Sequence, residues 1–296
     1  MAVRDLFLTD RDARGHSLLR IIADQVRGRP FFVVGALVAF AFLFAAVFAP
    51  WVAPYAPNFQ DPDHLMSPPS ALHWCGTDSF GQDLLSRVIY GTRYVLLIGF
   101  SSVAIGAVGG LAIGLAAGLL QGPAEWGLMR FVDAILALPS LIMAITFISI
   151  LGQGVDKVIY AVGFAMIGPF ARTVRADVLQ VRAQAFVEAA GLMGVDRLRI
   201  VWRHILPNVI FPLAVQATIR ISEAILVSSG LSFLGLGVVP PTPDWGLMIS
   251  EGRAFISIVP WISGVPGAAL ALLLIALSIV GDGVRERVDP KMRTNR

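Results

Sequence analysis

Long apolar runs separated by short polar segments are the dominant pattern of this 296-residue chain. A helix needs roughly 20 apolar residues to cross the hydrocarbon core of a membrane, and four stretches without Asp, Glu, Lys or Arg are long enough. These stretches are residues 31–60, 94–124, 134–155 and 254–281. Two further runs are less clean: 158–171 is short, and 208–236 contains Arg220 and Glu223. The pattern predicts an all-α membrane protein with six transmembrane helices.

The composition agrees with lipid as the main surrounding of the chain. Hydrophobic residues make up 56% and charged residues 15% of the sequence, whereas soluble domains are about 25% charged. A pI of about 9.4 could indicate a nucleic-acid binder. We discount this interpretation because the basic residues flank the apolar runs and do not share one surface. A single cysteine, Cys75, excludes an intrachain disulfide and a thiolate metal cluster. We therefore expect contact with membrane lipid and no nucleic-acid partner.

Lysine and arginine indicate the orientation, because they are concentrated in residues 1–30, 172–203 and 284–296. Basic loops remain on the cytoplasmic side of a membrane, so an even number of crossings places both termini there. The first apolar run exceeds the roughly 7–15 residues of a signal-peptide core. We expect residues 31–53 to be an uncleaved transmembrane helix, followed by an extracytoplasmic loop over 54–91.

The extracytoplasmic loop has two parts with different patterns. Prolines dominate its first part and forbid a regular helix there. Four apolar residues in its second part have helical spacing: Leu84, Leu85, Val88 and Ile89. Asp83 and Arg87 form an (i, i+4) pair beside them. The pattern predicts a short amphipathic helix at the outer membrane face that leads into the second span.

Small residues distinguish the second span. Gly106, Gly110 and Gly114 recur every four residues, a spacing that lets neighbouring membrane helices approach closely. This predicts tight packing within a bundle; a gating hinge is the alternative.

The segment between the fourth and fifth spans, 172–208, is too rich in helix formers to be a linker. Ala189, Ala190 and Gly191 predict a short helix that is thin on one side. Gly194 suits a left-handed helix end, and Asp196 can cap the helix that follows. A thin helix on the cytoplasmic side of a membrane bundle has the shape to enter a groove in another protein.

These residues resemble a known family. Glu188-Ala189-Ala190, followed by Gly194 and by Leu206-Pro207, is similar to the EAA loop of bacterial ABC importer permeases. The sequence Arg203-His204-Ile205-Leu206-Pro207-Asn208 looks like the version in the dipeptide, oligopeptide and nickel branch. Other matches resemble the second, C-type, permease of that branch, and their motif residues are Gly76, Thr77, Asp78, Asp83, Arg130, Asp133, Pro139, Pro207 and Asp282.

The resemblance implies a type I permease fold in the bacterial inner membrane. It implies a core of five transmembrane helices over 92–283, with the EAA loop at 186–208, and a cytoplasmic tail over 284–296. The implied partners are a homologous second permease in a heterodimer, two cytoplasmic ATPases and an extracytoplasmic solute-binding protein. The residues that it assigns to coupling with an ATPase are Phe186, Glu188, Ala189, Ala190, Gly191, Gly194 and Asp196.

The chain has no nucleotide site of the phosphate-loop type. Such a loop ends in Gly-Lys-Ser/Thr, but Lys157 follows Asp156 and Lys291 follows Pro290. An enzyme would require a nucleophile and a base placed together, and we find no such arrangement in the sequence. We expect a transport subunit that is not an enzyme and binds no cofactor, with ATP and Mg²⁺ on the partner ATPases. His64, His73 and Cys75 are interpreted as incidental, and no metal site is expected.

Arg220 and Glu223 are the strongest polar feature inside a span. Charges there face a partner or a wet cavity, so they either line the solute path or form an ion pair packed against the sister subunit. Relatives often carry a glutamate at the position of Ser228, which we include in the candidate path without transferring that role. Peptides are the expected solute, and nickel, glutathione or opines remain alternatives. A secondary transporter driven by an ion gradient is the alternative of another class; it predicts internal repeats and more midplane charges.

Overall fold

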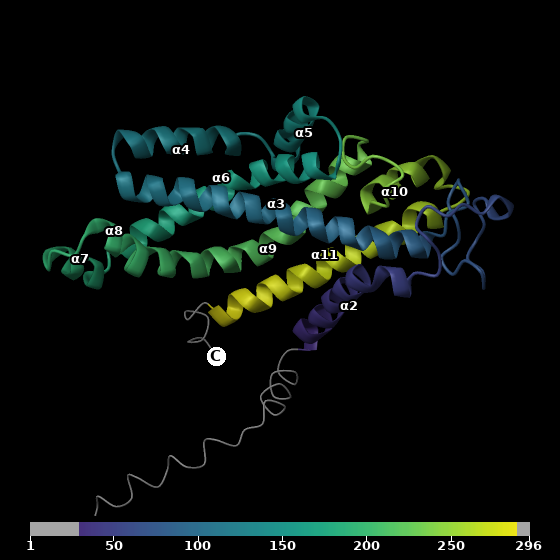
Figure 1. The fold of residues 1–296 in the computed structure, drawn as a ribbon, viewed down its shortest axis with the longest axis horizontal. Helices are drawn as coiled ribbons and strands as arrows, with labels where there is room; N and C mark the ends of the chain where they lie inside the picture. The colour runs from purple at the N-terminus through teal and green to yellow at the C-terminus, as the bar shows by residue number, and fades with distance from the viewer. Residues whose placement is uncertain (1–29, 289–296) are drawn as a thin grey trace, which may run out of the picture.

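The structure, a computed structural model, describes residues 30–288 as an elongated bundle of long helices (Figure 1). The basic tails considered above lie mostly outside these residues. The long helices are α2 (Pro30–Val52), α3 (Leu84–Leu120), α6 (Val155–Arg182), α9 (Leu206–Phe233) and α11 (Trp261–Val288). The shorter elements are η2 (Pro62–His64), α4 (Pro123–Leu136), α5 (Ser140–Leu151), α7 (Ala185–Leu192), α8 (Arg197–Ile200), η3 (Val201–Ile205), α10 (Trp245–Gly252) and η4 (Arg253–Phe255).

Within the described residues, five helical segments are long and apolar enough to cross a membrane. The third predicted span differs from a straight crossing, because α4 and α5 are bent by 92° at the break between them. Pro139 lies in this break with an extended ψ of 142°, and a proline disfavours helical geometry in the residue before it. Counting the bent pair as one span gives the six that the apolar pattern predicts.

Helices α3 and α6 form the tightest interface of the bundle. A Cβ added at Gly114 would lie 2.6 Å from the carbonyl oxygen of Ala171, and one at Gly118 would lie 2.6 Å from Val178 Cγ1. Gly110 faces the Cβ of Phe170 at still closer range. The close helix approach predicted from the glycine spacing is confirmed.

The start of α3 differs from the prediction of a separate amphipathic helix. Residues from Leu84 onward are the first turns of α3 itself, because Asp83 caps the helix by accepting from the Ser86 N–H at 2.8 Å. Arg87 is buried and contacts Asp78 and Glu251 at 3.7 and 3.9 Å, so the predicted pair with Asp83 is wrong. The carboxylate of Asp83 is already used to cap α3. Arg87 therefore pairs with carboxylates from other segments of the chain.

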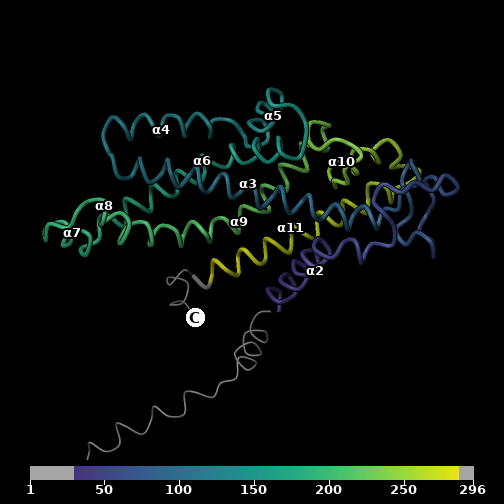
Figure 2. Tube along the Cα trace, in the orientation of Figure 1, coloured from purple at the N-terminus to yellow at the C-terminus, as the bar shows by residue number. Residues whose placement is uncertain are grey.

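The bundle has two contrasting ends. Figure 2 shows α7 and α8 at one end, and α10 with the loop between α2 and α3 at the other. We refer to them as the α7 end and the α10 end. Figure 1 shows α3, α6 and α9 running between the two ends.

Candidate functional site

Helix α7 is a short, well-terminated element. The Gly194 N–H donates to the Gly191 carbonyl at 3.1 Å, and the Val195 N–H donates to the Ala190 carbonyl at 3.1 Å. This bond pattern is the Schellman motif, which needs a left-handed residue, and Gly194 has φ +78°. Asp196 then accepts from the Leu198 N–H at 3.1 Å and caps α8. The predicted helix end and cap are both confirmed.

One side of α7 is exposed and thin. Val187 and Ala190 are buried against the bundle, while Glu188, Ala189 and Gly191 are exposed. A Cβ added at Gly191 or Gly194 would meet no atom within 4 Å. Apolar side chains lie around this face and are exposed by 85% at Leu192, 76% at Met193 and 48% at Phe186. Water-exposed apolar side chains around open glycines are typical of a surface that another protein covers.

One contact just before α7 and one made by α7 itself hold this end of the bundle together. Arg182, in the last turn of α6, donates to the carbonyls of Gly118 and Leu119 at the end of α3. A cation at these orphan carbonyls is favourable for a helix C-terminus. The ring of Phe186 lies 5.9 Å from that of His204. The chain thus enters α7 from a point where α6 is joined to α3, and α7 itself contacts the turn η3 that leads into α9.

The connection from α8 to α9 contains a π-helical turn. Pro207 has no N–H to give to the carbonyl four residues earlier, and the Leu206 N–H instead reaches the Val201 carbonyl. Asn208 Nδ2 donates to the His204 carbonyl at 2.6 Å, so this carbonyl has a hydrogen-bond partner. Thus Pro207 explains the local change of helix geometry between α7 and α9. A cavity of about 910 Å³ adjoins this region, lined among others by Glu188, Asp196 and Arg197.

Arg220 and Glu223 form an ion pair at 2.8 Å on α9. The guanidinium also lies over the ring of Phe170 at 5.6 Å, and both charged side chains are partly exposed at 23% and 40%. Ser228 is buried and donates to the Ile225 carbonyl of its own helix at 2.9 Å. The structure therefore brings Arg220 and Glu223 together and leaves Ser228 turned into its own helix.

The motif residues before α3 organise the α10 end. Gly76 has φ +78° and sits against Trp261, and Thr77 Oγ1 accepts from the Ser67 N–H at 2.9 Å. Asp78 Oδ1 accepts from the backbone N–H groups of Phe80 and Gln82, both at 2.9 Å. These hydrogen bonds hold the loop in a compact fold. They satisfy backbone groups that a regular helix cannot pair here, because the segment is rich in proline.

Burial changes the ionisation of this end. The pKa of Asp78 is raised chiefly by its burial, against the opposing effect of two backbone N–H donors and Arg87. The pKa of Glu251 is raised by burial as well, with Arg87 opposing. Arg87 Nε has no hydrogen-bond partner among the described residues. Arg87 is thus the buried cation that holds two carboxyl groups at the α10 end.

The other motif residues occupy separate places. Arg130 lies 5.2 Å over the ring of Trp126, and Asp133 pairs with Arg172 of α6 at 2.7 Å, so these two motif residues do not pair with each other. Asp282 is exposed near the end of α11.

Sequence reasoning missed several polar residues that the fold places in contacts. Arg175 pairs with Glu125 at 2.5 Å, and Glu251 faces Arg87. Asp244 is buried and caps α10 by accepting from the Leu247 N–H at 3.0 Å. An Asp immediately before the first apolar residue of a helix is a cap signal, and Asp244 directly precedes Trp245, so only Asp244 carried a local signal; the other pairs join distant segments.

Comparison with known proteins agrees with this geometry. Residues 110–294 match the family described as binding-protein-dependent transport system inner membrane component. Residues 17–69 match the N-terminal transmembrane domain of oligopeptide transport permease C.

Three relatives are similar over most of their length. The chain is 42% identical over 265 residues to the di/tripeptide transport system permease protein DppC of Pseudomonas aeruginosa, covering 88% of each. It is 36% identical over 270 residues to the dipeptide transport system permease protein DppC of Alkalihalophilus pseudofirmus, covering 91% of this chain and 89% of the relative. It is 40% identical over 262 residues to the glutathione transport system permease protein GsiD of Escherichia coli, covering 88% of this chain and 86% of the relative.

A solved structure shares the fold. A chain of the MetNI methionine ABC transporter, in an inward-facing conformation, matches with a TM-score of 0.56 at 20% identity, covering 69% of this chain and 96% of that one. The chain described here belongs to the family of binding-protein-dependent transport system inner membrane components, as a multi-pass permease subunit of an ABC importer whose ATP is hydrolysed by partner subunits.

Proposed function

We propose that this permease forms half of a channel for di- and tripeptides, together with a homologous second permease. In this proposal α7 is the coupling helix, and each of two cytoplasmic ATPases receives one such helix. Relatives named as dipeptide and di/tripeptide permeases, at 36% and 42% identity, support a peptide as the solute. The basic character of residues 172–203 supports a cytoplasmic α7 and cytoplasmic termini.

The exposed, thin face of α7 is the observation that carries the coupling role. Gly191 and Gly194 leave open space beside Leu192 and Met193, both strongly exposed. A groove in a partner can close around a helix of this shape, because the two glycines have no side chain that would keep the walls of the groove away from the helix.

The mechanism follows from how α7 is attached. ATP binding draws the two ATPases together, and a partner that grips α7 pulls on it. Arg182, at the end of α6 just before α7, fastens α6 to the end of α3, and the ring of Phe186 contacts His204 before α9. The long helices then move as connected levers, and access to the solute alternates between the two sides of the membrane.

The test uses the complete transporter reconstituted in vesicles with its solute-binding protein. Gly194→Val places a β-branched residue at φ +78°, which costs about 1–2 kcal/mol in left-handed geometry. Glu188→Trp adds bulk to the exposed face of α7. Both variants should insert and assemble normally, while peptide uptake and peptide-stimulated ATP hydrolysis fall at least tenfold, on the order of 1.4 kcal/mol of coupling.

Lys157→Met is the matched control, because Lys157 pairs only locally with Asp156 at the opposite end of α6. Its uptake should equal that of the wild type. Normal uptake by both α7 variants would refute the coupling role.

Glutathione is the second candidate solute, because a relative at 40% identity is named as a glutathione permease. Glutathione is itself a tripeptide with one unusual linkage, so both solutes require a channel for short peptides. Uptake of a labelled dipeptide should be reduced by excess unlabelled dipeptide and not by glutathione. The reverse pattern would assign glutathione.

A further inference from the structure

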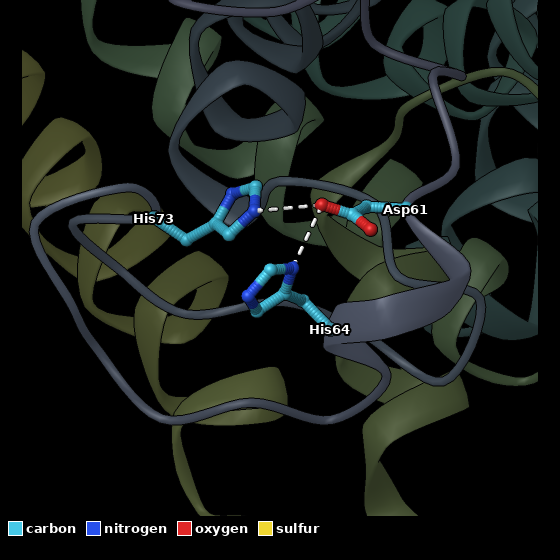
Figure 3. Close-up of side chains that lie close together, drawn as sticks. All are labelled: Asp61, His64 and His73. Atoms are coloured by element: carbon cyan, nitrogen blue, oxygen red, sulfur yellow. Dashed lines mark hydrogen bonds and ion pairs between the residues drawn. The ribbon is translucent and has the colours of Figure 1, made fainter.

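Three polar side chains converge in the loop between α2 and α3, at the α10 end. Figure 3 shows Asp61 between the rings of His64 and His73. Asp61 Oδ2 lies 2.8 Å from His64 Nδ1 and 3.7 Å from His73 Nε2. One ligand atom from each residue lies within 4.8 Å of the other two. Two imidazoles and a carboxylate at these separations have the composition of a transition-metal site.

His73 is prepared as a ligand by its surroundings. Its side chain is only 2% exposed, and Nδ1 lies 3.0 Å from Asp83 Oδ1. A carboxylate accepts hydrogen bonds, so Nδ1 carries the proton and Nε2 is the nitrogen with a free lone pair. That Nε2 faces Asp61 at 3.7 Å, which is beyond hydrogen-bond reach. A carboxylate behind a histidine whose other nitrogen points into a cluster is the arrangement that orients metal ligands.

Asp61 and His64 are held by the turn η2. Asp61 Oδ1 accepts from the Asp63 N–H at 3.1 Å and so caps the turn. This bond directs the second carboxylate oxygen towards the two rings (Figure 3). The side chains of Asp61 and His64 are 25% and 38% exposed, so an ion can enter from solvent.

We propose that Asp61, His64 and His73 bind one Zn²⁺ ion that fastens the turn η2 to the chain entering α3. Ligand atoms around tetrahedral zinc, with bonds of about 2.0–2.1 Å, lie about 3.4 Å from one another. The 3.7 Å pair already matches, and the 2.8 Å hydrogen bond lengthens as zinc replaces its proton. Water completes the fourth position on the exposed side. In the orientation proposed above, this site faces the extracytoplasmic side.

The test measures Zn²⁺ binding by the purified transporter. The transporter is purified through an affinity tag that contains no histidine. After removal of metal with a chelator, Zn²⁺ is titrated against a chromophoric competitor. The wild type should bind one more Zn²⁺ per copy of this chain than His64→Gln. Asp61→Asn keeps an oxygen to cap η2 and should weaken binding by more than about tenfold, since even second-shell losses reach that size. Zn²⁺ should raise the unfolding temperature of the wild type and not that of His64→Gln.

Two controls define the ligand set. His16→Ala removes a histidine outside the described residues, and Cys75→Ser removes the thiol two residues from His73; both variants should bind Zn²⁺ as the wild type does. Identical titrations for the wild type and His64→Gln would overturn the proposal, as would loss of the extra ion in either control. His64 is partly exposed and takes no part in the buried His73–Asp83 contact. His64→Gln therefore leaves that contact in place.

Discussion

The α10 end and the α7 end differ in how far each is completed by the chain itself. At the α10 end, Trp245 is fully buried and donates to the Val88 carbonyl at 3.0 Å, and Arg87 lies between two carboxyl groups. At the α7 end, Leu192 and Met193 are among the most exposed apolar side chains described. The buried polar contacts of the α10 end lie inside the subunit, whereas α7 presents apolar side chains beside open glycines.

Glycines make the same contrast in steric terms. A Cβ at Gly246 in α10 would collide with the Ser229 backbone, whereas one at Gly191 in α7 would meet nothing. Both glycines are helical, so backbone conformation does not separate them. Gly246 thus serves close packing within the chain, and Gly191 leaves the exposed side of α7 without a side chain.

The largest expected effect is at Arg87. Arg87→Met leaves the buried Asp78 and the partly exposed Glu251 without their cation, and breaking a buried ion pair costs about 3 kcal/mol or more. Thermal unfolding of the detergent-solubilised transporter should show a large drop in the unfolding temperature. Lys157→Met removes an exposed pair and should leave that temperature unchanged; equal effects would remove the contrast between buried and exposed charge.

A matched pair of glycine variants comes next. Gly246→Ala overpacks α10 against Ser229 and should lower the stability by about 1–3 kcal/mol. Gly191→Ala meets open space and should be neutral or stabilising by up to about 1 kcal/mol, because alanine favours a helix. The same unfolding assay measures both. Destabilisation by Gly191→Ala would show that α7 is already packed within the subunit.

A smaller effect should separate stability from partner binding. Leu192→Ala removes an 85% exposed side chain, so unfolding should not change. Its affinity for the ATPase should fall about tenfold, or about 1.4 kcal/mol, as for an anchor in an interface. Co-purification at graded ATPase concentrations measures this. Ile258→Ala, 79% exposed at the α10 end, is the control and should bind the ATPase normally.

The smallest effect is a change in pH dependence at Asp244. Burial raises the pKa of this carboxyl above the ordinary 3.8, against three hydrogen-bond donors. The folded state then binds the proton more tightly than the unfolded chain, so this stabilisation is present below the ordinary value and lost as the pH rises through the folded pKa. Asp244→Asn keeps the cap and removes the titration. As the pH rises from the ordinary value of 3.8, unfolding temperatures should fall more for the wild type than for the variant; parallel curves would contradict this.

The sequence predicted features whose cause is local. Apolar runs located the spans because lipid requires about 20 consecutive residues, and Gly194 and Asp196 marked the ends around α7 because caps act within a few residues. Contacts between distant segments could not be predicted in this way. Glu251 faces Arg87, and Asp61 joins His73, only after the loop and α10 have folded onto α3. The 92° bend between α4 and α5 was not predicted, because an apolar run indicates a span but not its path through the membrane.

Site-directed cross-linking at α7 tests the central claim most directly. In a Cys75→Ser background, Leu192→Cys gives the complete transporter one thiol on this permease, at a position of α7 whose side chain is 85% exposed. We expect it to form a covalent adduct with the ATPase and to react with a membrane-impermeant maleimide only from the cytoplasmic side. Labelling from outside intact cells, or a thiol that reaches neither the reagent nor the ATPase, would contradict the coupling role of α7.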